Sequence, residues 1–370
     1  MTPKVYFTNF CTANGETLPQ KLARLIMTAG MDQIDFKDKY VAIKIHFGEL
    51  GNMAHLRPGY ARVVVDLVKQ LGGKPFLTDA NTMYVGSRKN ALDHLETAYL
   101  NGFTPYTTGC HVIIADGLKG TDEVAVPVRG GEYVEKAMIG RAVMDADIVI
   151  SLNHFKGHEE AGFGGALKNL GMGCGSSAGK AEMHEDEKPT ANPEKCVGCG
   201  VCARNCAHDA VEMVDKKAHV NYDKCKGCGR CIGVCPTGAM KPSAENGTEL
   251  LSRRVSEYAY AVCKDKPNFH INMVIDISPF CDCYGNNDAP IVPDIGMFAS
   301  FDPVALDKAC VDAVNEQPII DNSLLGMQRF KKLGRDHLYT LHPDTRWEAG
   351  IDQGAKIGLG SAEYELVKMK

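Results

Sequence analysis

Eight of the fifteen cysteines fall in one short window of the chain, between Cys196 and Cys235. They form two runs with the same C-x2-C-x2-C-x3-C spacing, which is typical of ligands for cubane iron–sulfur clusters. In such pairs of runs, three thiolates of one run bind a [4Fe–4S] cluster, and its fourth ligand comes from the other run. We therefore expect two [4Fe–4S] clusters, one on Cys196, Cys199, Cys202 and Cys235, and one on Cys225, Cys228, Cys231 and Cys206.

The alternative for these runs is a pair of structural zinc sites. Zinc needs only four ligands per site, usually from two separated C-x2-C pairs, and two identical four-cysteine runs exceed that need. Over about residues 190–242 the segment resembles a bacterial two-cluster ferredoxin, and this resemblance implies electron transfer. One difference is that Cys206 precedes an alanine, whereas Cys235 precedes the usual proline.

A second group of thiols contains Cys281 and Cys283, which form a C-x-C motif. In an extended segment this spacing places both sulfurs on the same face of the chain. Together with Cys174 and a nearby histidine, they would form a site for an additional metal ion such as zinc, iron or nickel. The alternative is that one or more of these thiols are buried as small hydrophobic side chains, as free cysteines commonly are.

Polar side chains follow three predicted strands where each strand ends, and open α/β sheets bind their ligands at such positions. These residues are Lys44, His46, Asp79, Asn81, His154, Lys156 and His158. Any single one is more often a cap or a turn residue than a catalyst, but three such loops together favour a site. We expect Lys44, His46 and Lys168 to bind an anionic substrate or cofactor. His154 or His158 would be the general acid or base, because imidazole titrates near neutral pH.

The segment 162–175 is dense in glycine and follows the third of these loops. Glycines can expose backbone amides to an anion, so a phosphate cradle is one interpretation. Close packing of the backbone is the other. The spacing matches neither a Walker A loop nor the G-x-G-x-x-G pattern of dinucleotide-binding proteins.

Strand and helix signals alternate on both sides of the cysteine-rich window, which favours a largely parallel α/β sheet. We predict strands at 41–46, 74–78, 111–115, 147–152 and 270–277, and helices at 58–71, 86–99, 134–146, 249–263 and 303–314. The expected fold is an α/β body interrupted by an inserted ferredoxin-like (α+β) domain with two [4Fe–4S] clusters. The expected boundaries are 1–187 for the first part of the body, 188–245 for the insert and 246–370 for the second part.

The overall composition is that of an ordinary globular protein, since 44% of the 370 residues are hydrophobic and 24% are charged. The net charge of −5 predicts no nucleic-acid partner, and the absence of a long apolar run predicts no membrane span. The first residues lack the apolar run of a signal peptide, so we expect a cytoplasmic protein. In that reducing compartment, an odd number of cysteines favours metal or redox chemistry over disulfides.

The chain is similar to proteins of the domain-of-unknown-function 362 family over nearly its whole length. The segments that carry this resemblance are Lys44-x-His46-x-Gly48, Thr78-Asp79-x-Asn81-Thr82, Gly157-His158-x-x-Ala161-Gly162-Phe163-Gly164-Gly165-Ala-x-Lys168-Asn169, Gly179-Lys180-x-x-Met183-His184 and Cys281-Asp282-Cys283. The resemblance implies the interrupted α/β body and its iron–sulfur clusters. It implies no settled reaction.

A more distant resemblance is to the lactate racemase family, which uses a nickel-pincer nucleotide. His158, the stretch 161–165 and Lys168 have the spacing of that family's motif, with Gly164 where the family has serine. By this analogy Lys168 would anchor the cofactor, His158 would transfer the proton and His184 would bind the metal.

These features favour an iron–sulfur redox protein, an oxidoreductase whose two [4Fe–4S] clusters relay electrons to a site in the α/β body. Its partners would be an external electron donor or acceptor protein and a small anionic substrate. In this site Cys281 and Cys283 would be metal ligands or redox thiols. One alternative is an electron carrier without chemistry of its own. The other is a metal-dependent, nickel-pincer-like isomerase with auxiliary clusters.

Overall fold

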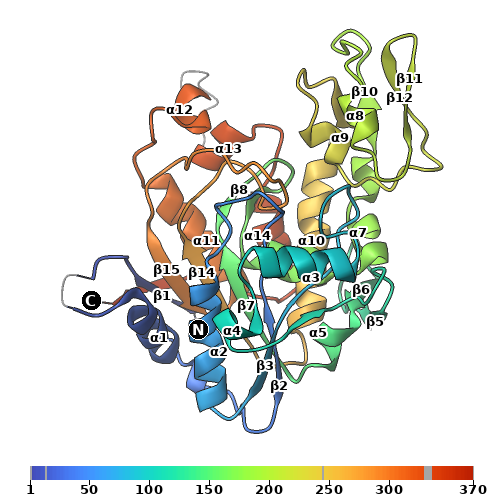
Figure 1. Cartoon of the computed structure of the whole chain (residues 1–370). Coiled ribbons are helices and arrows are strands. Elements are labelled where there is room, and N and C mark those ends of the chain that lie inside the picture. Colours follow the sequence, from blue (N-terminus) through green and yellow to red (C-terminus); the bar gives the residue numbers. More distant parts are fainter. Residues whose placement is uncertain (1, 13–14, 244–245, 329–335, 370) are drawn as a thin grey trace.

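The computed structural model describes residues 2–12, 15–243, 246–328 and 336–369. It contains an α/β body built on a mixed sheet with the strand order β16-β1-β15-β14-β7-β2-β3-β4 (Figure 1). Among these described strands, β15 alone runs antiparallel to its neighbours. The strands of the sheet are β1 (Lys4–Thr8), β2 (Tyr40–Lys44), β3 (Lys74–Asp79), β4 (Val112–Ile114), β7 (Ile148–His154), β14 (Asn268–Val274), β15 (Gly296–Ser300) and β16 (Glu365–Lys368).

A hydrophobic core lies on each face of the sheet. Side chains alternate between the two faces of a strand, so Ile148 and Ile150 of β7 join one core and Val149 joins the other. The first core is shared with α1 (Leu18–Thr28) and α2 (Pro58–Gln70). The second is shared with α6 (Ala166–Cys174), α10 (Gly247–Cys263), α11 (Pro303–Asn315) and α14 (Glu348–Lys356). Both faces of the central strands are therefore buried, which is why these strands are hydrophobic on both sides.

The cysteine-rich segment projects from the body beside the N-terminal end of α10 (Figure 1). Strands β10 (Pro189–Ala191) and β13 (Met240–Pro242) pair with each other and bring the two ends of the segment together. Its other elements are α8 (Val201–Arg204), β11 (Val211–Val214), β12 (Lys217–Val220) and α9 (Arg230–Gly233). A small core of its own contains Cys202, Val211, Ala218, Cys231 and Met240.

The remaining elements connect the sheet to the helices around it. They are η1 (Met31–Gln33), α3 (Ala91–Leu100), α4 (Pro105–Thr108), β5 (Glu123–Pro127), β6 (Lys136–Gly140), α5 (Arg141–Asp145), β8 (Lys156–His158), β9 (Gly162–Gly164), α7 (Ser177–Met183), η2 (Glu185–Glu187), α12 (Leu324–Gln328) and α13 (His337–Leu341). No helix within the described ranges combines the length and the apolar character needed to cross a membrane.

Most of the predicted elements are confirmed, but the helix predicted at 134–146 is wrong. This stretch forms β6, which pairs with β5, and only then the short helix α5. Ala137 and Ile139 of β6 are fully buried, so the hydrophobic period is that of a strand. The helix predicted from residue 86 begins at Ala91, because the Asn90 side chain caps its first turn.

Candidate functional site

A pocket with about 1050 Å³ of empty space, part of it open to solvent, lies where the central parallel strands end. Asp79 is the last residue of β3, His154 is the last residue of β7, and His46 follows β2 by two positions. All three line the pocket, as expected for the carboxyl edge of an open α/β sheet. The loops that follow these three strands therefore lie together in the structure, as predicted.

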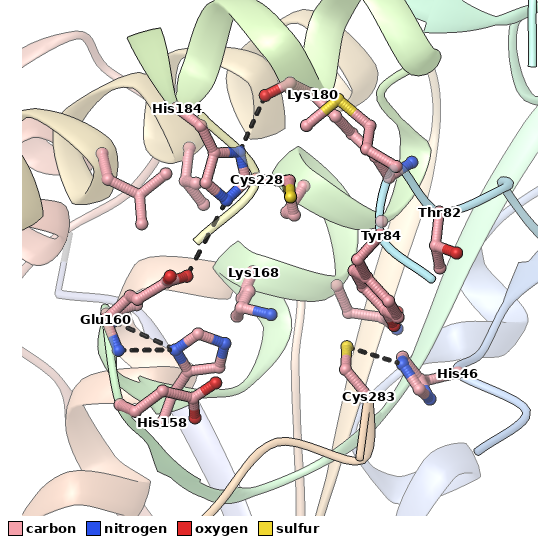
Figure 2. Close-up of a pocket in the computed structure, with 18 of the residues that line it drawn as sticks. His46, Thr82, Tyr84, His158, Glu160, Lys168, Lys180, His184, Cys228 and Cys283 are labelled. Atoms are coloured by element: carbon pink, nitrogen blue, oxygen red, sulfur yellow. Dashed lines mark hydrogen bonds and ion pairs between the residues drawn. The ribbon is translucent and has the colours of Figure 1, made fainter. Parts of the chain in front are cut away.

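Most of the site residues predicted outside the two cysteine runs reach this pocket, as does Cys228 of the second run. His46, His154, His158, Lys168, His184, Cys228 and Cys283 line it. Figure 2 shows Lys168 among Cys228, His158 and Cys283. Among the residues predicted as catalytic groups or as ligands of an additional metal ion, three are absent from its lining, namely Lys44, Cys174 and Cys281. Cys174 belongs to the hydrophobic core on the α6 side of the sheet.

Lys44 belongs to a buried network that includes pocket-lining residues. Its ammonium lies 2.8 Å from the Asp79 carboxylate and donates to the Asn169 side chain at 2.7 Å. Arg88 reaches the same network, 3.4 Å from Asp79 and 3.3 Å from Glu49. The sequence interpretation overlooked Arg88, which lies in the stretch predicted as a helix. With every charge paired, the network holds the ends of β2 and β3 together, and the Lys44 ammonium is already engaged by protein groups.

Two thiols and one imidazole form a compact group at one side of the pocket. Within the described part of the chain, His46, Cys281 and Cys283 are the one set of three candidate ligands whose atoms all lie within 4.8 Å of one another. The Cys281 thiol lies 2.9 Å from the Cys283 sulfur, and the Lys168 ammonium lies 3.6 Å from the Cys281 sulfur. His184 is not a member of this group. The candidate ligand set thus differs in part from the predicted one, because it contains His46 and lacks Cys174 and His184.

The electrostatics of this group favour a thiolate on Cys283. The hydrogen bond from Cys281 holds the pKa of Cys283 well below its usual range against the opposing effect of burial, and His46 and Lys168 lower it further. Burial alone would lower the pKa of Lys168, but the two sulfurs and Glu159 raise it, so its ammonium stays charged. The pocket thus contains a positively charged lysine beside a negatively charged sulfur.

The two histidines that face each other across the pocket are hydrogen-bond donors through Nε2. The Gly48 amide donates to His46 Nδ1 at 3.0 Å, so the proton of the neutral ring lies on Nε2, which is 3.3 Å from the Cys283 sulfur. At His158, the amides of Glu160 and Ala161 both donate to Nδ1 at 3.1 Å (Figure 2). Burial and the Lys168 charge hold the pKa of His158 well below its usual range. This ring is therefore neutral and presents an N–H group.

Glu159 is a pocket residue that the sequence interpretation missed, although it directly follows His158. Burial raises its pKa to about 7, with a further increase from Glu160. One of its carboxyl oxygens is buried without a hydrogen-bond partner, as are the Thr82 hydroxyl and Nε of Arg230, which also line the pocket. Buried polar atoms are normally paired, so these three indicate a polar ligand or ordered water in the pocket.

Helix α6 carries Lys168, and its first turn is fixed by a buried carboxylate. Asp307 accepts hydrogen bonds from the Ala166 and Leu167 amides at 2.7 and 2.8 Å. Further along, Gly171 packs so closely on α10 that a Cβ atom there would lie 2.0 Å from the Val255 carbonyl oxygen. Most of the glycine-dense segment 162–175 belongs to α6. The close packing against α10 explains Gly171, so no bound anion is needed to explain it.

The cysteine-rich segment packs against the rim of the pocket. Cys228 and Arg230 line the pocket itself. A Cβ atom on Gly227 would lie 2.5 Å from the His184 carbonyl oxygen, and one on Gly229 would lie 1.7 Å from the Glu160 carboxylate. These two glycines allow the second cysteine run to approach the body at this edge.

The eight cysteines line two separate small cavities in this segment. One cavity is lined by Cys196, Cys199, Cys202 and Cys235, and the other by Cys206, Cys225, Cys228 and Cys231. In neither set do three sulfurs lie within 4.8 Å of one another in the described structure. Sulfurs on one zinc ion would be about 3.8 Å apart. The sulfurs of each set are therefore more widely spaced than the ligands of a single zinc ion.

Comparisons with known proteins give one family and several relatives. The family model described as "Domain of unknown function (DUF362)" matches residues 41–312. The thylakoid-associated protein sll1697 of Synechocystis sp. is 30% identical over 142 residues, which are 37% of this chain and 38% of that protein. The chain thus matches well under half of the length of this curated relative.

Two solved structures match the chain at low scores. A Thermotoga maritima protein has a TM-score of 0.41 and 12% identity, over 80% of this chain and 58% of that chain. The lactate racemase apoprotein of Thermoanaerobacterium thermosaccharolyticum has a TM-score of 0.40 and 14% identity, over 95% and 76% of the two chains. The family match spans most of the sequence, and the chain belongs to the DUF362 family.

Proposed function

We propose that this protein is an iron–sulfur oxidoreductase in which the eight cysteines hold two [4Fe–4S] clusters that serve the pocket of the α/β body. When bound, such clusters exchange single electrons. The observation that carries the proposal is the position of Cys228, which belongs to one four-cysteine set and also lines the pocket. A cofactor held by that set would therefore be next to Lys168 and His158.

The local structure of the two runs supports this ligand assignment. Gly198 and Gly227 occupy the same place in their runs and have φ values of 73° and 74°, a conformation that favours glycine. The two loops therefore turn in the same way around their cavities. The Ala210 amide donates to the Cys206 sulfur at 3.2 Å, as amides near cluster ligands do. Burial raises the pKa of Cys228 to about 11, so a bound cation is needed to keep it as a thiolate.

Within the pocket, this chain's own residues would hold the substrate and its protons. Lys168 supplies a fixed positive charge, and His158 supplies a neutral N–H donor. Glu159 is the group that can gain or lose a proton near neutral pH, because its pKa is raised to about 7 by burial. A small polar or anionic substrate fits these groups, and an external electron-transfer protein would exchange electrons through the cysteine-rich segment.

Metal and sulfide analysis of protein purified without oxygen tests the proposal. We expect about eight irons and about eight acid-labile sulfides per chain. Cys199→Ser should lower both values, whereas the matched change Cys11→Ser, at an exposed cysteine outside both runs, should lower neither. Stoichiometric zinc without sulfide would overturn the proposal.

A second candidate is the metal-dependent isomerase with auxiliary clusters. It is favoured by one observation, that Lys168, His158 and His184 all line the same pocket. Nδ1 of His184 lies 2.8 Å from the Lys180 carbonyl oxygen, which leaves Nε2 on the side of Glu160 (Figure 2). Stoichiometric nickel that is lost in Lys168→Ala and His184→Ala would place this function first. A simple electron carrier would need none of these pocket residues.

A further inference from the structure

The Cys281 and Cys283 pair has the geometry of two thiols poised to form a bond. Their sulfurs are 2.9 Å apart, closer than the roughly 3.8 Å between two sulfurs on one zinc ion. They also differ in access. Cys283 lines the pocket, whereas Cys281 is buried behind it with 1% of its surface exposed. An accessible thiol backed by a buried one is the arrangement of an attacking and a resolving cysteine.

The imidazole beside this pair is arranged as a hydrogen-bond donor. A histidine that binds a metal through one ring nitrogen usually donates a proton from the other. His46 does the reverse, because the Gly48 amide donates to its Nδ1 at 3.0 Å. Nε2 therefore keeps its proton and points it at the Cys283 sulfur, 3.3 Å away (Figure 2). This arrangement stabilises a thiolate on Cys283 and disfavours a metal ion bound between His46 and the sulfurs.

We propose that Cys281 and Cys283 form a redox-active dithiol–disulfide couple that reduces a small disulfide substrate in the pocket. The Cys283 thiolate attacks one sulfur of the substrate, the Cys283–substrate disulfide forms, and the other half of the substrate leaves as a thiolate that takes up a proton. Cys281 then loses its proton and attacks the Cys283 sulfur. The internal disulfide forms, and the second half of the substrate leaves and is protonated. The substrate gains two electrons from the two cysteines and two protons, one from Cys281 and one from the solvent, to which Cys283 released its own proton on ionising.

The inference rests on the proposed function only for its supply of electrons. Reopening the internal disulfide takes two electrons and two protons, and a low-potential one-electron protein acting through the cysteine-rich segment would provide the electrons in two steps. Cys228 lines the same pocket as Cys283, so this supply would arrive beside the disulfide. The Lys168 ammonium, 3.6 Å from the Cys281 sulfur, carries a positive charge that would stabilise each thiolate as it is released.

Trapping with glutathione disulfide tests the couple directly. Full-length protein purified without oxygen is reduced, treated with glutathione disulfide, alkylated in acid and analysed by peptide mass spectrometry. We expect the wild-type peptide with both cysteines to lose two hydrogen atoms, and dithiothreitol to restore them. In Cys281→Ser, glutathione should remain attached to Cys283. In Cys283→Ser, Cys281 should not be modified, because it is buried. Cys110→Ser, at a buried thiol outside the pocket, should behave as wild type.

The outcomes separate this inference from the proposed function. If iron and sulfide are present but both thiols remain free, the proposed dithiol couple is wrong and the proposed clusters are supported. If the disulfide forms and reopens in protein without iron, the dithiol couple is supported and the proposed supply of electrons from the clusters is wrong. Preferential attachment of glutathione to Cys281, or a stoichiometric metal ion held by the two thiols, would also overturn the couple.

Discussion

At the scale of single residues, burial assigns roles that the sequence does not reveal. The strand-end pattern correctly predicted that His46, His154 and His158 would gather in one pocket. It could not predict that His158 would be a neutral donor, because this depends on two backbone amides and on the Lys168 charge. For the same reason it missed Glu159, whose unusual acidity comes only from its surroundings.

Glu159→Gln should weaken the pH dependence of stability. The folded state raises the Glu159 pKa from 4.5 to about 7, so it favours the protonated form. This stabilisation is complete below the unfolded pKa and is lost as the pH rises through about 7. Between about pH 6 and pH 8, the wild-type free energy of unfolding should fall by about 1–2 kcal/mol more than that of the variant. Thermal unfolding at both pH values measures this, and equal slopes would contradict it.

Lys168→Gln should make Cys283 less acidic. Removing a nearby positive charge disfavours the thiolate, so the pH profile of Cys283 alkylation by iodoacetamide should shift upward by about one unit. Lys180→Gln is the matched control, because Lys180 lines the same pocket but its ammonium donates to the Gly175 carbonyl. An equal shift in both variants would argue against a specific contact between Lys168 and the thiols.

At the scale of elements, the parallel strands near the middle of the sheet were the easiest to predict. β2 and β7 are largely hydrophobic, and their neighbouring places in the sheet explain why their ends meet. The buried strand β15 was not predicted. β6 was missed, and its partner β5 was not predicted either; these two strands pair with each other outside the main sheet. The position of α6 also could not be predicted, because its first turn is held by Asp307, more than a hundred residues away in sequence.

Asp307→Ala should destabilise the protein through α6. The change removes the acceptor for the Ala166 and Leu167 amides and for the Asn272 side chain, and it leaves these donors buried. We expect a loss of about 2–4 kcal/mol in the free energy of unfolding. Asp307→Asn keeps one acceptor oxygen and should lose about half as much. Thermal unfolding compares the two, and an alanine variant as stable as wild type would contradict this role.

At the scale of the whole molecule, the position of the cysteine-rich segment against the body brings one of the two cysteine sets to the pocket. The internal repeat predicted which cysteines would gather, and the two cavities contain those sets. The repeat could not predict which face of the cysteine-rich segment meets the body. That contact involves Gly227 and Gly229 of the second run with His184 and Glu160, and none of these positions carries a pattern that indicates an interface.

Gly229→Ala should displace the cysteine-rich segment from the pocket. The new Cβ atom would lie 1.7 Å from the Glu160 carboxylate, and φ is 68°. Gly238→Ala is the matched control, because φ is 62° there and no atom lies within 4 Å of the new Cβ. Both changes add backbone strain of about 1–2 kcal/mol, but only the first breaks the contact. Iron loss to a chelator should be several-fold faster in Gly229→Ala, and equal rates would contradict the docking role.

The central claim is that electrons from two clusters reach a dithiol couple in the pocket, and an anaerobic reductive titration tests it most directly. Oxidised full-length protein is titrated with dithionite while its visible absorbance and free thiols are followed. We predict that wild-type protein takes up about four electron equivalents, one for each cluster and two for the disulfide, and that Cys283→Ser takes up about two. Uptake of about two equivalents by both proteins would contradict the account.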